Sequence, residues 1–401
     1  MELWMTGIDH ARAPLAVRER FAMTKRQQAW LLETLQTQEG VLGAAVLATC
    51  NRTAVWVHCL PGDTPPLVRR LCEAVEAPRA DGAYLHSCTG EAAVQTLFET
   101  AAGLRSRIFG EDQILTQVKE ALERARAGGF ADGVIEVLFR MAVTSAKQVK
   151  TGLQTALVNT SAVDCALARL RETGYDLRGR RCLVIGNGKM GKLAAQALRE
   201  AGADVTVTVR QYRGGVVEIP AGCRRIDYGQ RLALFPQSEL ILSATASPNV
   251  TVKYEEAAAA GLRPGAVLID LAVPRDIDPR VASLGVTLWD IDQFSVPETA
   301  RLAEARAWAG SVLAAGEAAF ATWYHCRDLI PRLDALSRRF GRDAANRISK
   351  EIPTSIRTQA ASGAEKELRR LLFAVRDRAG AAAFRQCVEA VELAMDGRGR
   401  V

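Results

Sequence analysis

The feature that most constrains the fold of this chain is a glycine-rich turn placed directly after an apolar strand. The run Cys182–Gly186 is followed by Gly188 and Gly191 in a Gly-x-Gly-x-x-Gly spacing, and helical apolar spacing continues over Lys192–Ala201. The first glycine permits a tight turn, the second lets backbone N–H groups approach a pyrophosphate, and the third permits close packing of the helix, whose N-terminus attracts the anion. We therefore predict a dinucleotide site formed by Gly186, Asn187, Gly188, Lys189, Met190 and Gly191.

The segment around this turn alternates between short apolar runs and helical or irregular stretches. Further buried-looking strands are predicted at Val205–Val209, Leu240–Ala244, Val267–Leu271 and Val286–Leu288. This order predicts a Rossmann-type, doubly wound domain over residues 156–295. The stretch Gln211–Ile226 contains several glycines and a proline where such domains often carry a helix, so one crossover is expected to be short or irregular.

The end of the second strand of this domain indicates which dinucleotide is bound. An acidic residue there accepts from the ribose 2′-hydroxyl of NAD, but here Val209 is followed by Arg210, with Arg213 close by. A guanidinium at this position favours the 2′-phosphate of NADPH. The alternative is that Arg210 is simply a solvated residue at the end of a strand.

The flanking segments predict two further domains. Residues 1–155 mix strands at Leu3–Ile8, Gly43–Ala48 and Ala54–Cys59 with a helix at Lys25–Gln36, which predicts an α+β domain. Apolar spacing over Glu91–Arg126 and Gly133–Lys150 predicts helices that follow this domain in the chain. Residues 296–401 are predicted to be entirely helical, with helices at Pro297–Arg327 and Glu365–Arg378. The overall class is α/β multi-domain, and the helical tail is expected to form a homodimer, with packing on its own chain as the alternative.

Length and composition set the class of protein and the compartment. A chain of 401 residues with 48% hydrophobic and 24% charged residues is an ordinary globular protein of two or three domains. The N-terminus lacks a basic leader followed by an apolar run, and no long apolar stretch occurs, so a cytoplasmic protein without a membrane span is expected. The nine cysteines are scattered singly, which fits reduced thiols and neither a disulfide framework nor a metal site. The net charge of +7 permits a polyanionic partner.

One cysteine stands in a position that suits a nucleophile. Cys50 lies between a small apolar strand and another extended run, so it is expected at a strand end or sharp turn. Arg52 would favour the thiolate, while Thr49 and Asn51 offer donors for a developing oxyanion. The alternative is that Cys50 is an ordinary buried cysteine.

Several blocks of the chain, in order, resemble the glutamyl-tRNA reductase family. The segment from Gly7 to Pro14 resembles the N-terminal signature of that family, and Thr49–Arg52 resembles its active-site motif. The segments Ala101–Ser106 and Gly110–Lys119 resemble its substrate-binding helix. Two further blocks are Ser161–Val163 and Asp270–Asp276. The resemblance runs through the first 295 residues, and the helical tail matches only in character.

The resemblance implies a reaction and a set of site residues. Cys50 would attack the ester of glutamyl-tRNA(Glu), a thioester would form, and hydride from NADPH would release glutamate-1-semialdehyde, the precursor of 5-aminolevulinate and the tetrapyrroles. The residues implied to hold the glutamyl group are Thr49, Asn51, Arg52, Ser106, Glu111, Asp112, Gln113 and Gln117. Arg52 suits a carboxylate. The implied partners are the tRNA, a second copy of the chain and glutamate-1-semialdehyde aminomutase, but no DNA.

The chain also departs from the family pattern. A family histidine ahead of the Ala-Gly-Leu block is Thr96 here, and none of the other histidines aligns with it. The nearest, His86, is either a residue that approaches the site from a neighbouring strand or, as we predict, an exposed loop residue. Ala54 and Arg105 replace usual acids, and Asp112 replaces a usual proline.

Two other functions remain open at this level. One is an NADPH-dependent reductase of a small thioester or imine that does not use tRNA. The other is a catalytically silent homologue that binds tRNA or a biosynthetic partner. Basic residues that would contact tRNA phosphates, or that are simply solvated, are Arg105, Arg107, Lys119, Arg124, Arg126, Lys147 and Lys150.

Overall fold

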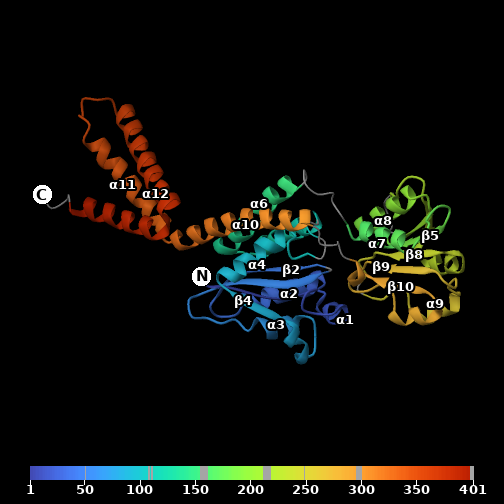
Figure 1. Cartoon of the computed structure of the whole chain (residues 1–401). Helices are drawn as coiled ribbons and strands as arrows, with labels where there is room; N and C mark the ends of the chain where they lie inside the picture. Colours follow the sequence, from blue (N-terminus) through green and yellow to red (C-terminus); the bar gives the residue numbers. More distant parts are fainter. Residues whose placement is uncertain are drawn as a thin grey trace. The chain divides into compact units, whose positions relative to one another are not determined.

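The computed structural model describes most of the chain, which forms two compact units (Figure 1). The described residues are 1–49, 51–106, 109, 112–153, 161–210, 218–247, 249–294 and 300–397. One unit runs from Glu2 to Leu313, and the other begins at Ala314. Within the described ranges, no helix combines the length and the apolar character that crossing a bilayer requires.

The N-terminal part of the first unit is built on a 4-stranded antiparallel sheet with strand order β2-β3-β1-β4. Its strands are β1 (Leu3–Asp9), β2 (Val41–Ala48), β3 (Arg52–Cys59) and β4 (His86–Thr89). β1, β2 and β3 match the predicted strands to within two residues at each end, because alternating apolar residues set their period. β4 was not predicted, since its sequence His-Ser-Cys-Thr has no apolar pattern.

Helices cover both faces of this sheet. On one face, Val55 and Val57 pack with helices α2 (Lys25–Gln36) and α3 (Leu67–Ala74). On the other face, Trp56 donates from its indole N–H to the carbonyl of Ala93 at 3.0 Å and meets Phe139 edge-on, at 5.7 Å between ring centroids. Alternate residues of β3 therefore face opposite layers, as the pleat of a strand requires.

The helices of this second face are α4 (Glu91–Ala101), α5 (Asp112–Ala127) and α6 (Gly133–Leu153). The helical spacing predicted over Glu91–Arg126 is thus two helices, separated by a turn in which Gly103 has φ +75°. Short turns of helix, α1 (Leu15–Arg18), η1 (Glu19–Phe21) and η2 (Arg79–Tyr84), complete this part.

The second part of the first unit is a 6-stranded parallel sheet with order β10-β9-β8-β5-β6-β7. Its strands are β5 (Arg181–Ile185), β6 (Asp204–Val209), β7 (Arg224–Asp227), β8 (Leu240–Ser243), β9 (Val267–Asp270) and β10 (Thr287–Asp290). The doubly wound, Rossmann-type prediction is confirmed. β7 was not predicted, because two of its four residues are arginines and it shows no apolar pattern.

Helices also cover both faces of the parallel sheet, as this fold class requires. One core includes residues of α7 (Ala162–Glu172) and α8 (Lys189–Glu200), and the other includes residues of η3 (Tyr228–Gln237), α9 (Tyr254–Ala260) and η4 (Pro279–Leu284). A short turn, η5 (Ile291–Gln293), follows β10. Part of the predicted irregular crossover, 211–217, lies outside the described residues, and its described remainder leads into β7 without a helix.

The C-terminal part of the chain is helical, as predicted. It consists of α10 (Ala300–Cys326), α11 (Leu329–Asn346) and α12 (Thr354–Gly397), and the division between the two compact units falls within α10. The predicted short piece Glu365–Arg378 is part of α12, which breaks at Gly380, where φ is +82°. A core that includes Leu333, Leu372 and Phe384 joins α11 to both halves of α12.

Candidate active site

The turn that joins β2 to β3 carries the predicted nucleophile motif. Cys50 itself lies outside the described residues, but both of its neighbours are described. The Thr49 hydroxyl accepts from the backbone N–H groups of Asn51 and Arg52, both at 3.2 Å, and the Thr49 N–H donates to the Arg52 carbonyl at 2.8 Å. Thr49 therefore fixes the shape of the turn, and the prediction that the motif stands at a sharp turn is confirmed for these flanking residues.

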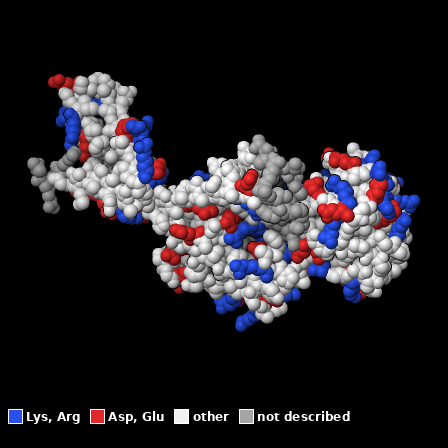
Figure 2. Space-filling view, viewed as in Figure 1, with Lys and Arg blue, Asp and Glu red and all other residues white. Residues whose placement is uncertain are grey.

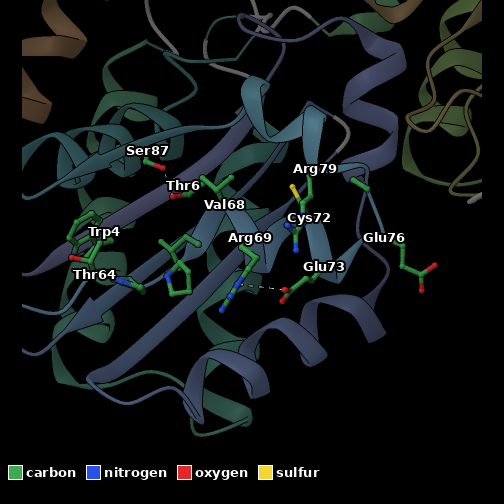
Figure 3. A pocket seen from close by; sticks show the side chains of 14 residues that line it. Trp4, Thr6, Thr64, Val68, Arg69, Cys72, Glu73, Glu76, Arg79 and Ser87 are labelled. Atoms are coloured by element: carbon green, nitrogen blue, oxygen red, sulfur yellow. Dashed lines mark hydrogen bonds and ion pairs between the residues drawn. The ribbon is translucent and has the colours of Figure 1, made fainter.

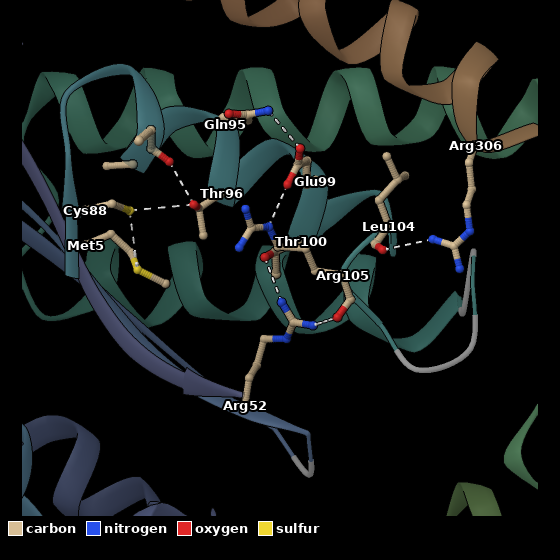
Figure 4. Close-up of polar contacts among 12 residues, drawn as sticks. Met5, Arg52, Cys88, Gln95, Thr96, Glu99, Thr100, Leu104, Arg105 and Arg306 are labelled. Atoms are coloured by element: carbon tan, nitrogen blue, oxygen red, sulfur yellow. Dashed lines mark hydrogen bonds and ion pairs between the residues drawn. The ribbon is translucent and has the colours of Figure 1, made fainter. Parts of the chain in front are cut away.

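Arg52 is buried beneath helix α4 (Figure 4). Its side chain donates to the hydroxyl of Thr100 at 2.8 Å and to the backbone carbonyl of Arg105, and the residue is only 5% exposed. Arg105 is in turn paired with Glu99, at 2.6 Å between Nε and Oε2. These contacts tie the β2–β3 turn to the end of α4 and the segment that follows it.

Thr96, which replaces the family histidine, has no group that titrates near neutral pH. It is 4% exposed, and its hydroxyl donates to the Ala92 carbonyl one turn earlier at 2.7 Å. The sulfur of Cys88 lies 3.6 Å from the same hydroxyl oxygen (Figure 4). Thr96 thus packs against the sheet as a core residue.

His86 is the first residue of β4, so the prediction of an exposed loop histidine is wrong. It is half-buried and pairs with Gly7 across the sheet, and a four-residue strand with no apolar residue gave no sequence signal for this placement. Burial, followed by the positive charge of Arg12, lowers the pKa of His86 below its usual value.

The predicted substrate helix is only partly described. Ser106 is buried in the middle of the α4–α5 connection, and its N–H donates to the Gly103 carbonyl at 3.2 Å. Gln113 and Gln117 are half-buried and lie one turn apart on the same face of α5. Glu111 and the side chain of Asp112 lie outside the described residues. The structure therefore brings Thr49, Asn51 and Arg52 together, and it places the two glutamines on a neighbouring helix.

The glycine-rich turn lines a cavity of about 580 Å³ at the carboxyl ends of β5, β6 and β8. Gly186 has φ +111°, and a Cβ there would lie 2.6 Å from the Ala244 carbonyl oxygen. A Cβ on Gly191 would lie 2.1 Å from the Gly186 carbonyl oxygen, whereas a Cβ on Gly188 would meet nothing within 4 Å. The three glycines thus have the predicted separate roles: a turn, an open approach and close helix packing.

The rim of this cavity carries a guanidinium. Arg210 follows β6 and lies over the ring of Tyr228, at 4.6 Å from Cζ to the ring centroid. Arg231 lies over the same ring at 4.2 Å and donates to the Thr251 carbonyl at 2.9 Å. Tyr228 is therefore positioned by Arg231, and its ring in turn contacts Arg210 at the cavity. The sequence did not predict this role of Tyr228, because η3 contains no recognisable motif.

Two buried carboxylates are linked by hydrogen bonds to Thr245, one of the residues that line the cavity. Asp276 is fully buried and accepts from the hydroxyls of Ser243, at 2.7 Å, and Thr245, at 2.6 Å, and Thr245 lines the cavity. Asp270 accepts from the backbone N–H groups of Ala272, Asp276 and Ile277, at 2.8 to 2.9 Å. Burial raises the pKa of Asp270 to about 7. The block Asp270–Asp276 was recognised in the sequence, but its structural role was not.

A second cavity, of about 840 Å³, lies on the α3 side of the N-terminal sheet (Figure 3). Trp4, Thr6 and Ser87 line it from the sheet, and Val68 and Cys72 line it from α3. It is larger than the dinucleotide cavity, yet none of the predicted site residues lines it. We therefore place the candidate active site at the β2–β3 turn and the dinucleotide cavity.

Three of the seven predicted tRNA-contacting residues are engaged in ion pairs. Arg105 is paired with Glu99, Arg124 with Glu120, and Arg126 with Glu123 and Glu136. Lys119 and Lys147 are exposed, and Arg107 lies outside the described residues. Figure 2 shows Lys and Arg interspersed with Asp and Glu on the visible face.

Comparisons with known proteins agree on one family. The model "Glutamyl-tRNAGlu reductase, N-terminal domain" matches residues 6–153, and "Shikimate / quinate 5-dehydrogenase" matches residues 167–296. A glutamyl-tRNA reductase of Acetivibrio thermocellus is 38% identical over 300 residues, which cover 74% of this chain and 89% of the relative. One of Moorella thermoacetica is 34% identical over 348 residues, covering 83% and 78%.

A solved structure, that of glutamyl-tRNA reductase from Methanopyrus kandleri, is also similar. It is 22% identical and covers 97% of this chain and 99% of its own, with a TM-score of 0.45. The assignment depends on the sequence relatives, which are more than 30% identical over most of this chain. The chain belongs to the glutamyl-tRNA reductase family.

Proposed function

We propose that this protein is an NADPH-dependent glutamyl-tRNA reductase, which converts glutamyl-tRNA(Glu) to glutamate-1-semialdehyde. The observation that carries the proposal is the combination, in one chain of this family, of a Thr-Cys-Asn-Arg turn held at a sheet end with a cavity built around a Gly-x-Gly-x-x-Gly turn. The product is the precursor of 5-aminolevulinate, and the enzyme would serve tetrapyrrole biosynthesis.

In this proposal Cys50 is the nucleophile. Its sulfur attacks the ester carbonyl of glutamyl-tRNA, the C–O bond to the ribose breaks, and a thioester remains on the protein. The contacts of Thr49 and Arg52 support the assignment, because they fix the two described residues that flank the motif. NADPH, when bound, supplies the hydride that reduces the thioester.

The substrate-binding residues remain a proposal, and the surroundings of Arg52 refine it. We infer that Thr49, Asn51, Arg52, Ser106, Glu111, Asp112, Gln113 and Gln117 form the glutamyl pocket. The Arg52 guanidinium already donates to Thr100 and to Arg105. Its positive charge would therefore attract the substrate electrostatically, without a direct hydrogen bond from those two donors. The amides of Gln113 and Gln117 are more accessible and would donate to the glutamyl group.

The dinucleotide cavity has the features that NADPH needs. The open approach at Gly188 leaves room for the pyrophosphate at the N-terminus of α8, and Gly186, Asn187, Lys189, Met190 and Gly191 complete the loop. Arg210, presented by Tyr228, would bind the 2′-phosphate. These features support NADPH over NADH.

We propose domains at residues 1–155, 156–295 and 296–401, in a cytoplasmic homodimer. The unpartnered apolar side chains of α12 support a dimer: Leu393 is 73% exposed, Leu371 58% and Ile356 51%. The expected solution mass is therefore twice 43.4 kDa. We also propose the aminomutase as a partner that receives the aldehyde, because a free α-amino aldehyde is reactive.

The test of the proposed function is product formation. Purified protein is incubated with glutamyl-tRNA(Glu) and NADPH, and the aldehyde is trapped and identified by mass. The proposal predicts semialdehyde that depends on both substrates and is lost with NADH at equal concentration. Reduction of a small glutamyl thioester but not of glutamyl-tRNA would instead indicate a small-substrate reductase.

A further inference from the structure

The loop that follows β9 is bonded to the N-terminal part of the first unit. Glu19, in η1, accepts at its Oε1 from both the backbone N–H and the Nε of Arg275, each at 2.7 Å. Both side chains are largely buried, with exposed fractions of 17% for Glu19 and 20% for Arg275. Because one of the two donors is a backbone N–H, the carboxylate fixes the main chain of the loop as well as the guanidinium.

The next residue of this loop is bonded to the wall of the dinucleotide cavity. Asp276 is fully buried, and its carboxylate accepts from the backbone N–H of Thr245 at 2.8 Å and from the Thr245 hydroxyl at 2.6 Å. It also accepts at 2.7 Å from the hydroxyl of Ser243, the last residue of β8. Thr245 lines the cavity. Since Arg275 and Asp276 are adjacent, a continuous series of bonds joins Glu19 to the cavity wall.

The strand order indicates which half of the dinucleotide this wall would meet. β5, which leads into the glycine-rich turn, lies between β6 and β8. In the proposed function the turn after β5 binds the pyrophosphate, and Arg210, after β6, binds the 2′-phosphate of the adenosine half. The nicotinamide half then extends to the β8 side, where residues 244–247 line the cavity. The bonds from Glu19 therefore hold the nicotinamide side of the cavity.

A second ion pair joins the same two parts of the chain at a different place. Arg18 is 3% exposed, and its side chain donates to the Ala13 carbonyl at 3.2 Å and to the carboxylate of Asp292. Asp292 lies in η5, after β10, and β9 separates β10 from β8. Arg18 thus bonds the segment after the edge strand, whereas Glu19 bonds the loop beside the cavity, so the two pairs can be tested against one another.

We propose that Glu19 and Arg275 are positioning residues for the reduction step, an inference that rests on the proposed function. They fix the main chain of the loop after β9, and through Asp276 they hold Thr245 on the nicotinamide side of the cavity. Both act through these neighbours and not on the reacting atoms. Their effect is to fix the orientation of the hydride donor relative to the acyl group, where a displacement of about 1 Å costs about 10²-fold in rate.

Hydrogen exchange of the full-length protein, without substrates, measures the link directly. Glu19→Ala removes the acceptor of the Arg275 N–H, so this amide should exchange about tenfold faster or more, and the Thr245 amide should follow it. Glu19→Gln keeps an amide oxygen as acceptor and should resemble the wild type. The amides of β5 report any general loss of stability. Faster exchange at Arg275 without a change at Thr245 would overturn the inference, because the loop would then move without the cavity wall.

The two steps of the reaction supply the second readout. Labelled glutamate is first transferred from glutamyl-tRNA to the protein without NADPH, and saturating NADPH is then added. Glu19→Ala should accept label at the wild-type rate and release it as semialdehyde about 10- to 100-fold more slowly. Its Kd for NADPH should stay within about threefold of the wild-type value, because the glycine-rich turn and Arg210 are unchanged. A general loss of folded protein would lower the yield of both steps alike.

Two further variants keep the test independent of the folding of Glu19→Ala. Arg275→Ala loses the guanidinium but keeps the backbone N–H bond to Glu19, so it should slow the release of label by about three- to tenfold and leave the transfer unchanged. Arg20→Gln removes the neighbouring ion pair with Asp81, which lies wholly within the N-terminal part. This variant should match the wild type in both steps.

Asp292→Asn decides whether the effect belongs to Glu19 or to any contact between the two parts of the chain. It should release label at the wild-type rate, and a loss equal to that of Glu19→Ala would contradict the inference. A release rate of Glu19→Ala within about threefold of the wild type would also reject the inference and leave the proposed function intact. Failure of the wild-type protein to accept label from glutamyl-tRNA would reject the proposed function itself.

Discussion

The guanidinium of Arg52 and the hydroxyl of Thr100 are 2.8 Å apart in a buried contact between β3 and α4. The residues that flank Cys50 thereby depend on a helix some fifty positions later in the chain. A second bond, from Arg52 to the Arg105 carbonyl, extends this frame to the segment that leads to the predicted substrate helix. Arg52 is thus part of the scaffold of the site as well as a source of positive charge within it.

Thr100→Val tests this frame, because valine keeps the shape of threonine and removes the acceptor. One N–H of a buried guanidinium would lose its partner, so unfolding should become easier by about 1–3 kcal/mol. The reaction rate should fall as well, since Arg52 gains freedom. Denaturant unfolding and steady-state kinetics measure the two effects, and Thr100→Ser, which keeps the hydroxyl, is the control. Equal stability of the wild type, Thr100→Val and Thr100→Ser would show that the bond from Arg52 to Thr100 does not stabilise the fold.

Asp132 predicts an acid-dependent loss of stability. Burial alone would raise its pKa, but hydrogen bonds from His58 and from backbone N–H groups outweigh burial and lower it. Since the folded state binds the proton less tightly than the unfolded state, this stabilisation is complete above about pH 4 and is lost as the pH falls below that value. Asp132→Asn should therefore be destabilised by about 1–3 kcal/mol at pH 7.

Urea unfolding at pH 7, 5 and 3 measures this difference. The gap between wild type and Asp132→Asn should be similar at pH 7 and 5 and should narrow at pH 3. A gap that stays constant down to pH 3 would contradict the assignment of the lowered pKa to Asp132.

Two alanine substitutions in the glycine-rich turn should behave in opposite ways. A Cβ at Gly188 meets no protein atom within 4 Å, so Gly188→Ala should fold normally and lose affinity for NADPH by at least tenfold. A Cβ at Gly191 would lie 2.1 Å from the Gly186 carbonyl oxygen, so Gly191→Ala should lower the melting temperature. Calorimetric titration and thermal unfolding distinguish these results, and tight NADPH binding by Gly188→Ala would count against the proposed pyrophosphate site.

Arg210→Gln should change the choice of dinucleotide. Loss of a charged contact to the 2′-phosphate should weaken NADPH binding by about 10- to 100-fold and leave NADH binding nearly unchanged. Tyr228→Phe keeps the ring beneath the guanidinium and serves as the control. Parallel losses for both dinucleotides would show that Arg210 does not read the phosphate.

The sequence predicted those elements whose apolar residues recur at a regular spacing, and the one turn whose backbone requires glycine. It found β1, β5 and α2 because their apolar spacing is regular, and it found the turn at Gly186 because only glycine fits there. It missed β4, whose residues have no apolar period and are held by pairing with β1. Partners distant in sequence were also out of reach: the contacts of Arg52 with Thr100 and of Asp276 with Thr245 exist only after folding.

The central claim is that Cys50 carries the glutamyl group, and the most direct measurement follows that group. Glutamyl-tRNA labelled on the glutamate is mixed with wild type or Cys50→Ser without NADPH, and acid-stable, thiol-sensitive label on the protein is located by peptide mass. The account predicts one labelled peptide containing Cys50, discharged to semialdehyde when NADPH is added, and no such label in Cys50→Ser. Full semialdehyde production by Cys50→Ser, or label on another residue, would contradict it.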